Sequence, residues 1–219
     1  MKTRIIKISA IFASVFALFT LTSCDSVMKI QMSTEGVRFS LNSVLGKTFT
    51  ETISGIMGLS DGTENGQELF NADGMKKDLT DAGFTKVNVK TKNSEEFTID
   101  FAPSKTGADP LSKAGILKYD AKLAPYIHLS KENLKNLYDN LPFEVQSYID
   151  MLMSPSFTGE EMTDDEYLEL VASVYGQKLS DEIQKSKIDF VFVQGDKQKS
   201  MKLSLLSVLN TTGDLIIKN

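Results

Sequence analysis

His128 is the only histidine among the 219 residues, and a lone imidazole can accept or donate a proton near neutral pH. Without a second histidine the chain cannot build a metal site from several imidazoles. No Ser or Cys motif marks a nucleophile for His128 to activate. His128 lies between Ile127 and Leu129 in an apolar stretch, as expected of a histidine at a sheet edge or in the core. A structural role is therefore favoured, and a lone base paired with a carboxylate is the alternative.

The tripeptide Gly46-Lys47-Thr48 follows an expected strand and opens an expected helix, which is the setting of a phosphate-binding loop. The loop pattern requires another glycine five residues before Gly46, and the chain has Leu41 there. Without that glycine the chain cannot easily make the tight turn that directs backbone N–H groups at a phosphate. We therefore interpret Lys47 as a solvated lysine in the first turn of a helix.

Acidic side chains gather at residues 160–166, and Asp100 and Asp189 lie in expected strands. A calcium loop of the EF-hand type alternates oxygen ligands around a central glycine, and this cluster does not. Carboxylates in the first turn of a helix are favoured by the helix dipole, which explains the cluster without a metal. We predict no metal and no cofactor, and Asp100 or Asp189 would be the catalytic groups if the protein were an enzyme.

The only cysteine, Cys24, follows the features of a secretory signal. Three basic residues, Lys2, Arg4 and Lys7, precede an uncharged and mostly apolar run over residues 8–21. This run is shorter than the ~20 residues that a helix needs to cross a bilayer. A cleaved signal peptide over residues 1–23 is therefore the better interpretation than a permanent transmembrane helix.

The signal ends in Leu21-Thr22-Ser23-Cys24, which resembles the lipobox of bacterial lipoproteins: leucine, two small residues and cysteine. The resemblance implies a diacylglyceryl group on Sγ of Cys24 and cleavage by signal peptidase II between Ser23 and Cys24. Two or three acyl chains are a sufficient membrane anchor, because each buried CH₂ contributes about 0.8 kcal/mol. An ordinary signal followed by a free or buried cysteine is the alternative. We expect a cell-envelope protein held by lipid at the periplasmic face of a membrane or at the cell surface.

The net charge of the chain is -5, and removal of residues 1–23 takes away three basic residues and no acidic ones. An acidic protein with no basic stripe in its sequence is a poor match for nucleic acid, so we predict no nucleic-acid partner. The charge also gives no help in holding the body on an anionic membrane, which leaves that task to the lipid. An apolar fraction of 41% predicts a folded core for residues 28–219.

Alternating apolar and polar residues predict strands, and helical spacing with capping residues predicts helices, after a short tether over residues 24–27. The expected hairpins cover residues 28–41, 87–101 and 188–208, with further strands at 126–129 and 215–217. The expected helices cover residues 44–59, 71–82, 130–141, 142–152 and 163–185, and residues 103–124 read as a surface connection. This order predicts a single α+β domain, an antiparallel sheet built from hairpins with helices packed on one face. Halves 28–103 and 125–219 share the order, through either degenerate internal duplication or coincidence.

The expected helix over residues 44–59 has an apolar face and a nearly uncharged polar side. The apolar residues at helical spacing are Leu45, Phe49, Ile53, Ile56 and Met57. Such a face usually belongs to the core, and the alternative is an apolar surface directed at a membrane or a hydrophobic ligand.

Three functional hypotheses follow. The first is a non-enzymatic envelope lipoprotein, a binding or structural module at a membrane surface with an unidentified envelope protein as partner. The second is a carrier or sensor of a lipid or another hydrophobic ligand, which would require a continuous apolar cavity. The third is a carboxylate-dependent envelope enzyme, which would require a deep pocket with convergent polar groups.

Overall fold

A computed structural model describes residues 26–33, 36–56, 72–93, 95–140, 146, 150, 153–211 and 213–218. Their largest element is a six-stranded sheet with the order β3-β4-β2-β1-β7-β8. Its strands are β1 (Ser26–Ser33), β2 (Gly36–Val44), β3 (Thr85–Thr91), β4 (Glu96–Ala102), β7 (Lys187–Gln194) and β8 (Lys197–Ser204). A second sheet has three strands in the order β5-β6-β9, which are β5 (Leu117–Tyr119), β6 (Pro125–Leu129) and β9 (Leu215–Ile217).

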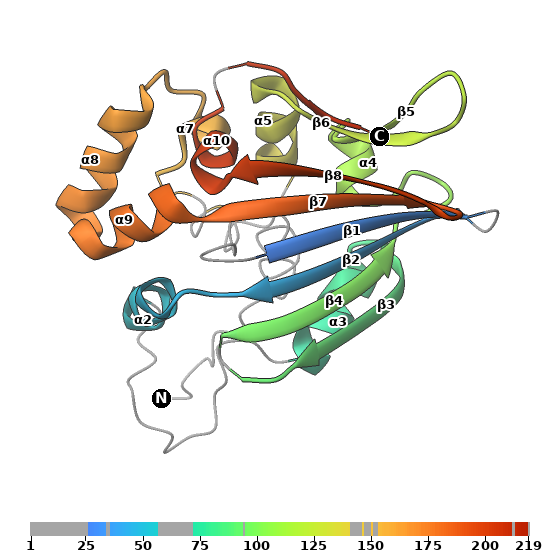
Figure 1. Cartoon of the computed structure of the whole chain (residues 1–219), viewed down its shortest axis with the longest axis horizontal. Helices are drawn as coiled ribbons and strands as arrows, with labels where there is room; N and C mark the ends of the chain where they lie inside the picture. Colours follow the sequence, from blue (N-terminus) through green and yellow to red (C-terminus); the bar gives the residue numbers. More distant parts are fainter. Residues whose placement is uncertain are drawn as a thin grey trace, which may run out of the picture.

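The large sheet is assembled from three antiparallel hairpins, β1–β2, β3–β4 and β7–β8, as the alternation predicted. The β3–β4 and β7–β8 hairpins flank β1–β2 on its two sides (Figure 1). The β1–β7 junction is parallel, with Ser26 opposite Ile188, so the sheet is antiparallel except at this one contact. Mixed pairing of this kind cannot be read from local periodicity. Internal duplication of the two halves stays a prediction.

Helices pack on the sheet face that carries the large apolar side chains, and α3 and α4 lie behind the strands in Figure 1. The helices of the described residues are α2 (Lys47–Ile56), α3 (Ala72–Asp81), α4 (Pro110–Lys113), α5 (Lys131–Asp139), α7 (Pro155–Thr158), α8 (Asp164–Tyr175), α9 (Gln177–Lys185) and α10 (Leu205–Leu209). The chain therefore has an α+β fold, with two mostly antiparallel sheets and helices packed around them. No helix in these described segments is long and apolar enough to cross a membrane.

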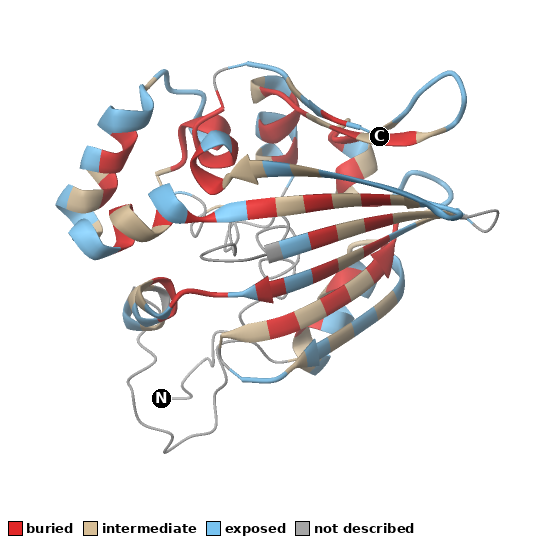
Figure 2. Ribbon diagram, in the orientation of Figure 1, coloured by how far each residue is buried: buried red, intermediate tan, exposed pale blue. Residues whose placement is uncertain are grey.

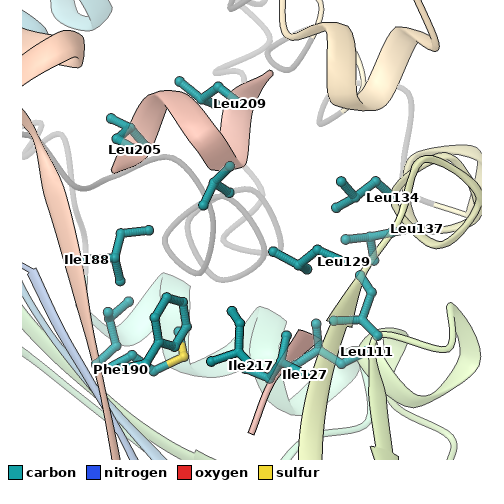
Figure 3. Packing of buried hydrophobic residues seen from close by; sticks show 14 of the residues in the cluster. Leu111, Ile127, Leu129, Leu134, Leu137, Ile188, Phe190, Leu205, Leu209 and Ile217 are labelled. Atoms are coloured by element: carbon teal, nitrogen blue, oxygen red, sulfur yellow. The ribbon is translucent and has the colours of Figure 1, made fainter. Parts of the chain in front are cut away.

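One hydrophobic core joins both sheets and the helices. Figure 2 shows the buried residues as bands that alternate along the strands, because successive side chains of a strand point to opposite faces. Figure 3 shows Ile188 and Phe190 of β7, Ile127 and Leu129 of β6, and Leu205 and Leu209 of α10 around the same space. All of these side chains belong to a single cluster, so the small sheet is part of the main body.

Two element boundaries differ from the prediction because of one glycine and one serine. The stretch 163–185 is two helices, α8 and α9, since Gly176 between them has a φ of 92°, a left-handed conformation that glycine adopts without steric cost. The strand expected to continue to residue 208 ends at Ser204, whose hydroxyl accepts a hydrogen bond from the backbone N–H of Ser207 and opens α10. Burial of the three α10 leucines and of Val208 holds this helix in place.

Two further corrections concern segments predicted to be irregular. Residues 103–124 contain α4, capped by Asp109, as well as β5. Strand β1 begins at Ser26, so two residues of the predicted tether 24–27 are already paired in the sheet.

Candidate functional site

The residues of the lipobox, Ser23 and Cys24 included, lie outside the described residues. The predicted apolar surface on the 44–59 helix is wrong for its first two members, because Leu45 and Phe49 are each only 2% exposed and belong to the core. The side chains of Ile53 and Ile56, and Met57 as a whole, lie outside the described residues. The described part of this helix therefore offers core packing.

Lys47 and the acidic cluster have the structural roles that the sequence favoured. Lys47 is the first residue of α2 and forms an exposed ion pair with Glu51, with 3.6 Å between Nζ and Oε1. Thr163 and Glu166 form a capping box at the start of α8. Hydrogen bonds from the backbone N–H and then the hydroxyl of Thr163 lower the pKa of the Glu166 carboxyl. No group of three or more potential metal ligands gathers anywhere in the described segments.

A polar cluster beside a surface pocket lies on the outer face of the small sheet and is centred on His128 of β6. Lys118 comes from the neighbouring strand β5, Asp214 directly precedes β9, and Asn133 lies in the first turn of α5. His128 alternates with the buried Ile127 and Leu129, so its side chain faces away from the core. The small sheet thus brings together the imidazole of β6, the amine of β5 and a carboxylate just before β9.

Each nitrogen of the His128 ring has an ionisable side chain nearby, but only Nδ1 is hydrogen-bonded. Nζ of Lys118 lies 2.9 Å from Nδ1, and Nε2 lies 3.4 Å from Oδ2 of Asp214. An ammonium group can only donate hydrogen bonds, so Nδ1 is the acceptor and the neutral ring carries its proton on Nε2. Nε2 is buried and makes no hydrogen bond to any described residue, because 3.4 Å is beyond the usual range for a hydrogen bond to Asp214. The ring therefore presents an N–H donor whose hydrogen bond is incomplete.

Asn133 fixes the position of this cluster on the body. Its Nδ2 donates to the carbonyl of Gly115 at 3.0 Å and to the carbonyl of His128 at 3.2 Å. Ser130 caps α5 by accepting a hydrogen bond from the backbone N–H of Asn133. The amide and the cap together tie β6 to α5 and to the turn before β5.

A surface pocket of about 260 Å³ opens beside the ring. It is lined by Lys118, His128, Ser130, Lys131, Glu132, Asn133, Gly213 and Asp214. The side chains of its two lysines are donors, and its two carboxylates are acceptors. This lining suits a small polar molecule better than a hydrophobic one. Metal binding at Nε2 is disfavoured, because a metal needs the lone pair of that nitrogen while Lys118 directs the proton to it.

A second hollow of about 250 Å³ lies on the same face, around the other end of the small sheet. Its lining combines the apolar residues Ala124, Pro125 and Ile216 with Tyr126, Asp120 and Lys218. Both hollows are on the surface and neither extends into the core. The sequence singled out His128 alone, and no local signal connected it with Lys118 or Asp214.

Asp100 and Asp189, the carboxylates considered for an enzyme, lie on the outer face of the large sheet in strands β4 and β7. Asp100 accepts a hydrogen bond from Asn88, and Asp189 lies opposite Lys202. Strands β2 and β1 separate the two carboxylates in the sheet order, so they do not form a catalytic pair.

Comparisons of the chain with protein-family models, with curated proteins and with solved structures found no match.

Proposed function

We propose that this protein is a lipid-anchored component of a bacterial cell envelope, a non-enzymatic module that binds its partner through its surface. The anchor would be the acyl chains on Cys24. The observation that carries the proposal is the start of β1 at Ser26, which leaves only Asp25 between Cys24 and a paired strand inside the large sheet. One intervening residue reaches only a few ångströms, so such an anchor would hold the body at the bilayer.

The core supports a module of this kind over a carrier of hydrophobic ligands. The apolar side chains between the two sheets contact one another in a single cluster (Figure 3). The two surface hollows described above are open, and the one beside His128 is polar. A lipid carrier would instead bury its ligand in an apolar cavity.

The pocket beside His128 is the best candidate for ligand contact within this function. A small polar ligand would contact the amines of Lys118 and Lys131 and the carboxylates of Glu132 and Asp214, which all line the pocket. The Lys118–His128 contact argues against catalysis by the ring, because it occupies the nitrogen that would act as a base.

The anchor is tested by growing bacteria that express the full chain with radiolabelled fatty acid. Wild type and Ser23→Ala, which keeps a small residue before the cysteine, are expected to incorporate label and to fractionate with membranes. Cys24→Ala is expected to lose the label. Unchanged labelling of Cys24→Ala would contradict the proposal. The label decides the outcome, because an uncleaved precursor of the variant can stay with membranes through its apolar signal.

A further inference from the structure

The outer face of the large sheet gathers basic side chains that are far apart in the sequence. Because Phe39 and Ile188 point into the core, their neighbours Arg38 and Lys187 point to the opposite face. Register places Lys29 opposite Ser40, Lys90 opposite Thr98, and Lys202 opposite Asp189 on the same face. The sequence has no basic stripe because these residues are dispersed along the chain, and five strands each contribute one of them to this face.

The acidic residues of this face offset only part of that charge. Glu96 forms an ion pair with Lys92, with 2.7 Å between Oε2 and Nζ. The other two acidic residues of the face, Asp100 and Asp189, offset two of the five basic residues. The face therefore has an excess of three positive charges. The whole chain carries a net charge of -5, so the molecule is electrically polarised.

The basic side chains of this face are available to a partner. Arg38, Lys90, Lys187 and Lys202 are exposed, and Lys29 is half-buried between its neighbours. None of the five forms an ion pair with another described residue. The helices α3 and α4 pack on the opposite face, behind the sheet in Figure 1.

Two apolar side chains lie on this face at the end where β1 begins. Val27 is 38% exposed and Val44 is 41% exposed. Val27 lies opposite Asn42 on the outer face, and Val44 is two residues further along the same strand. This end of the face is therefore the one next to Cys24, and it combines apolar contact with surrounding positive charge, as interfacial surfaces do.

We propose that the outer face of the large sheet docks on the anionic headgroups of the bilayer that holds the lipid anchor. This inference rests on the proposed anchor. Because only a few residues separate Cys24 from Val27 and Lys29, an anchored chain would hold these two side chains close to the headgroup region. Each basic side chain near an anionic bilayer strengthens the electrostatic attraction between the protein and the bilayer. Docking would leave the small sheet and the pocket beside His128 accessible from the aqueous side.

The test uses the full lipidated protein in vesicles of phosphatidylcholine, with or without phosphatidylglycerol. A fluorophore on Ser40→Cys reports from the outer face, and one on Ser173→Cys reports from α8. A headgroup-linked quencher is expected to quench the Ser40 probe more strongly in anionic vesicles than in neutral ones, and salt should reverse this. The Ser173 probe is expected to respond equally in both vesicle types.

Charge variants make the result specific. Neutralising Lys29, Arg38 and Lys202 to Gln is expected to weaken docking about fivefold per residue, from ~1 kcal/mol per basic side chain. The matched control neutralises Lys105, Lys113 and Lys122, which are exposed around α4 and β5, and should change docking little.

Three outcomes would overturn the inference. The first is quenching at Ser40 that ignores anionic lipid and salt, and the second is an equal loss in the control variant. The third is capture of a soluble anionic polysaccharide by the face without any response to anionic lipid, which would assign the charge to a different partner. In all three the fatty-acid label stays on Cys24 if the proposed anchor is correct, so failure of the docking is separable from failure of the anchor.

Discussion

Nζ of Lys118 lies 2.9 Å from Nδ1 of His128, and the two side chains come from adjacent strands of the small sheet. Because the amine is the donor, the contact selects one tautomer of the neutral imidazole. The chain has no other histidine, so the ring can be observed without overlap from a second one.

We predict that neutral His128 carries its proton on Nε2. Two-bond nitrogen–proton NMR spectra should show Nδ1 as the unprotonated nitrogen at a pH where the ring is neutral. Lys118→Met removes the donor and is expected to mix the two tautomers, whereas Lys122→Met in the β5–β6 connection should leave the spectrum unchanged. An Nδ1–H tautomer in the wild type would show that the Lys118 contact is absent in solution.

Phe101 is predicted to be among the most costly core residues to truncate. Its ring stacks on Phe39 with the two centroids 5.1 Å apart, and it forms an edge-to-face pair with Phe84 with the centroids 4.9 Å apart. Phe101→Ala should lower the free energy of unfolding by about 3–5 kcal/mol, through lost burial and the cavity left behind. Urea unfolding measures this change. Val174→Ala, at a 54% exposed position of α8, is the control and should change stability by less than about 0.5 kcal/mol.

The capping box of α8 predicts a dependence of stability on pH. Hydrogen bonds from Thr163 hold the pKa of Glu166 below its ordinary value of 4.5 in the folded protein. A carboxyl with a lowered folded pKa contributes stability above its unfolded pKa, and this contribution is lost as pH falls through the folded pKa. The stability difference between wild type and Glu166→Gln should therefore be present at pH 7 and shrink below pH 4.5.

Unfolding free energies measured from pH 7 to pH 3 check this prediction. Glu169→Gln changes an exposed carboxyl on the same helix and serves as the control. A difference between wild type and Glu166→Gln that grows on acidification would contradict the assigned hydrogen bonds.

Thr163→Ala should destabilise α8 by about 1 kcal/mol through loss of the N-cap.

Ser156 joins α7 to the end of α10 through two buried hydrogen bonds. A water molecule could replace them only by entering the core. The hydroxyl of Ser156 donates to the carbonyl of Val208 at 2.9 Å and accepts from the backbone N–H of Thr211 at 2.6 Å. Ser156→Ala leaves both buried backbone groups unsatisfied, so we expect a loss of about 1–3 kcal/mol.

Hydrogen exchange is the sharper measurement for Ser156→Ala, because the amide of Thr211 should lose protection more than amides in β1. Ser173→Ala removes an exposed hydroxyl on α8 and should be nearly neutral. Equal protection of Thr211 in wild type and Ser156→Ala would show that the bond to Ser156 does not govern local opening.

The sequence predicted the parts of the fold that local chemistry determines. The three hairpins followed from alternation, and the predicted start of the 163–185 helix and end of the 71–82 helix each lie within one residue of the bounds of α8 and α3. The helix break at Gly176 was missed because the apolar spacing continues across it. The start of α10 was missed because Leu205–Leu209 is as apolar as a buried strand.

The residues of both candidate sites come together only through the pairing of strands in the folded chain. The β5–β6 pairing brings Lys118 close to His128, and the β6–β9 pairing brings Asp214 close to it. The residues next to His128 in the sequence predict neither pairing. The basic face likewise results from the order of strands, since β7 joins the strands of Lys29 and Lys202 into one sheet. Net charge described the whole chain correctly but averaged over two surfaces of different sign.

The parallel contact between β1 and β7 also determines when the fold can be completed. Ser26 of β1 pairs with Ile188 of β7. Strand β1 lies near the start of the domain, and it can complete its pairing only when β7, near the other end of the chain, is available. Local hairpins can form early, whereas closing so long a loop is slow and leaves an edge of β1 unpaired meanwhile. A chain that emerged from a translocation channel with its N-terminus already in lipid would therefore remain unfinished until its last strands had crossed.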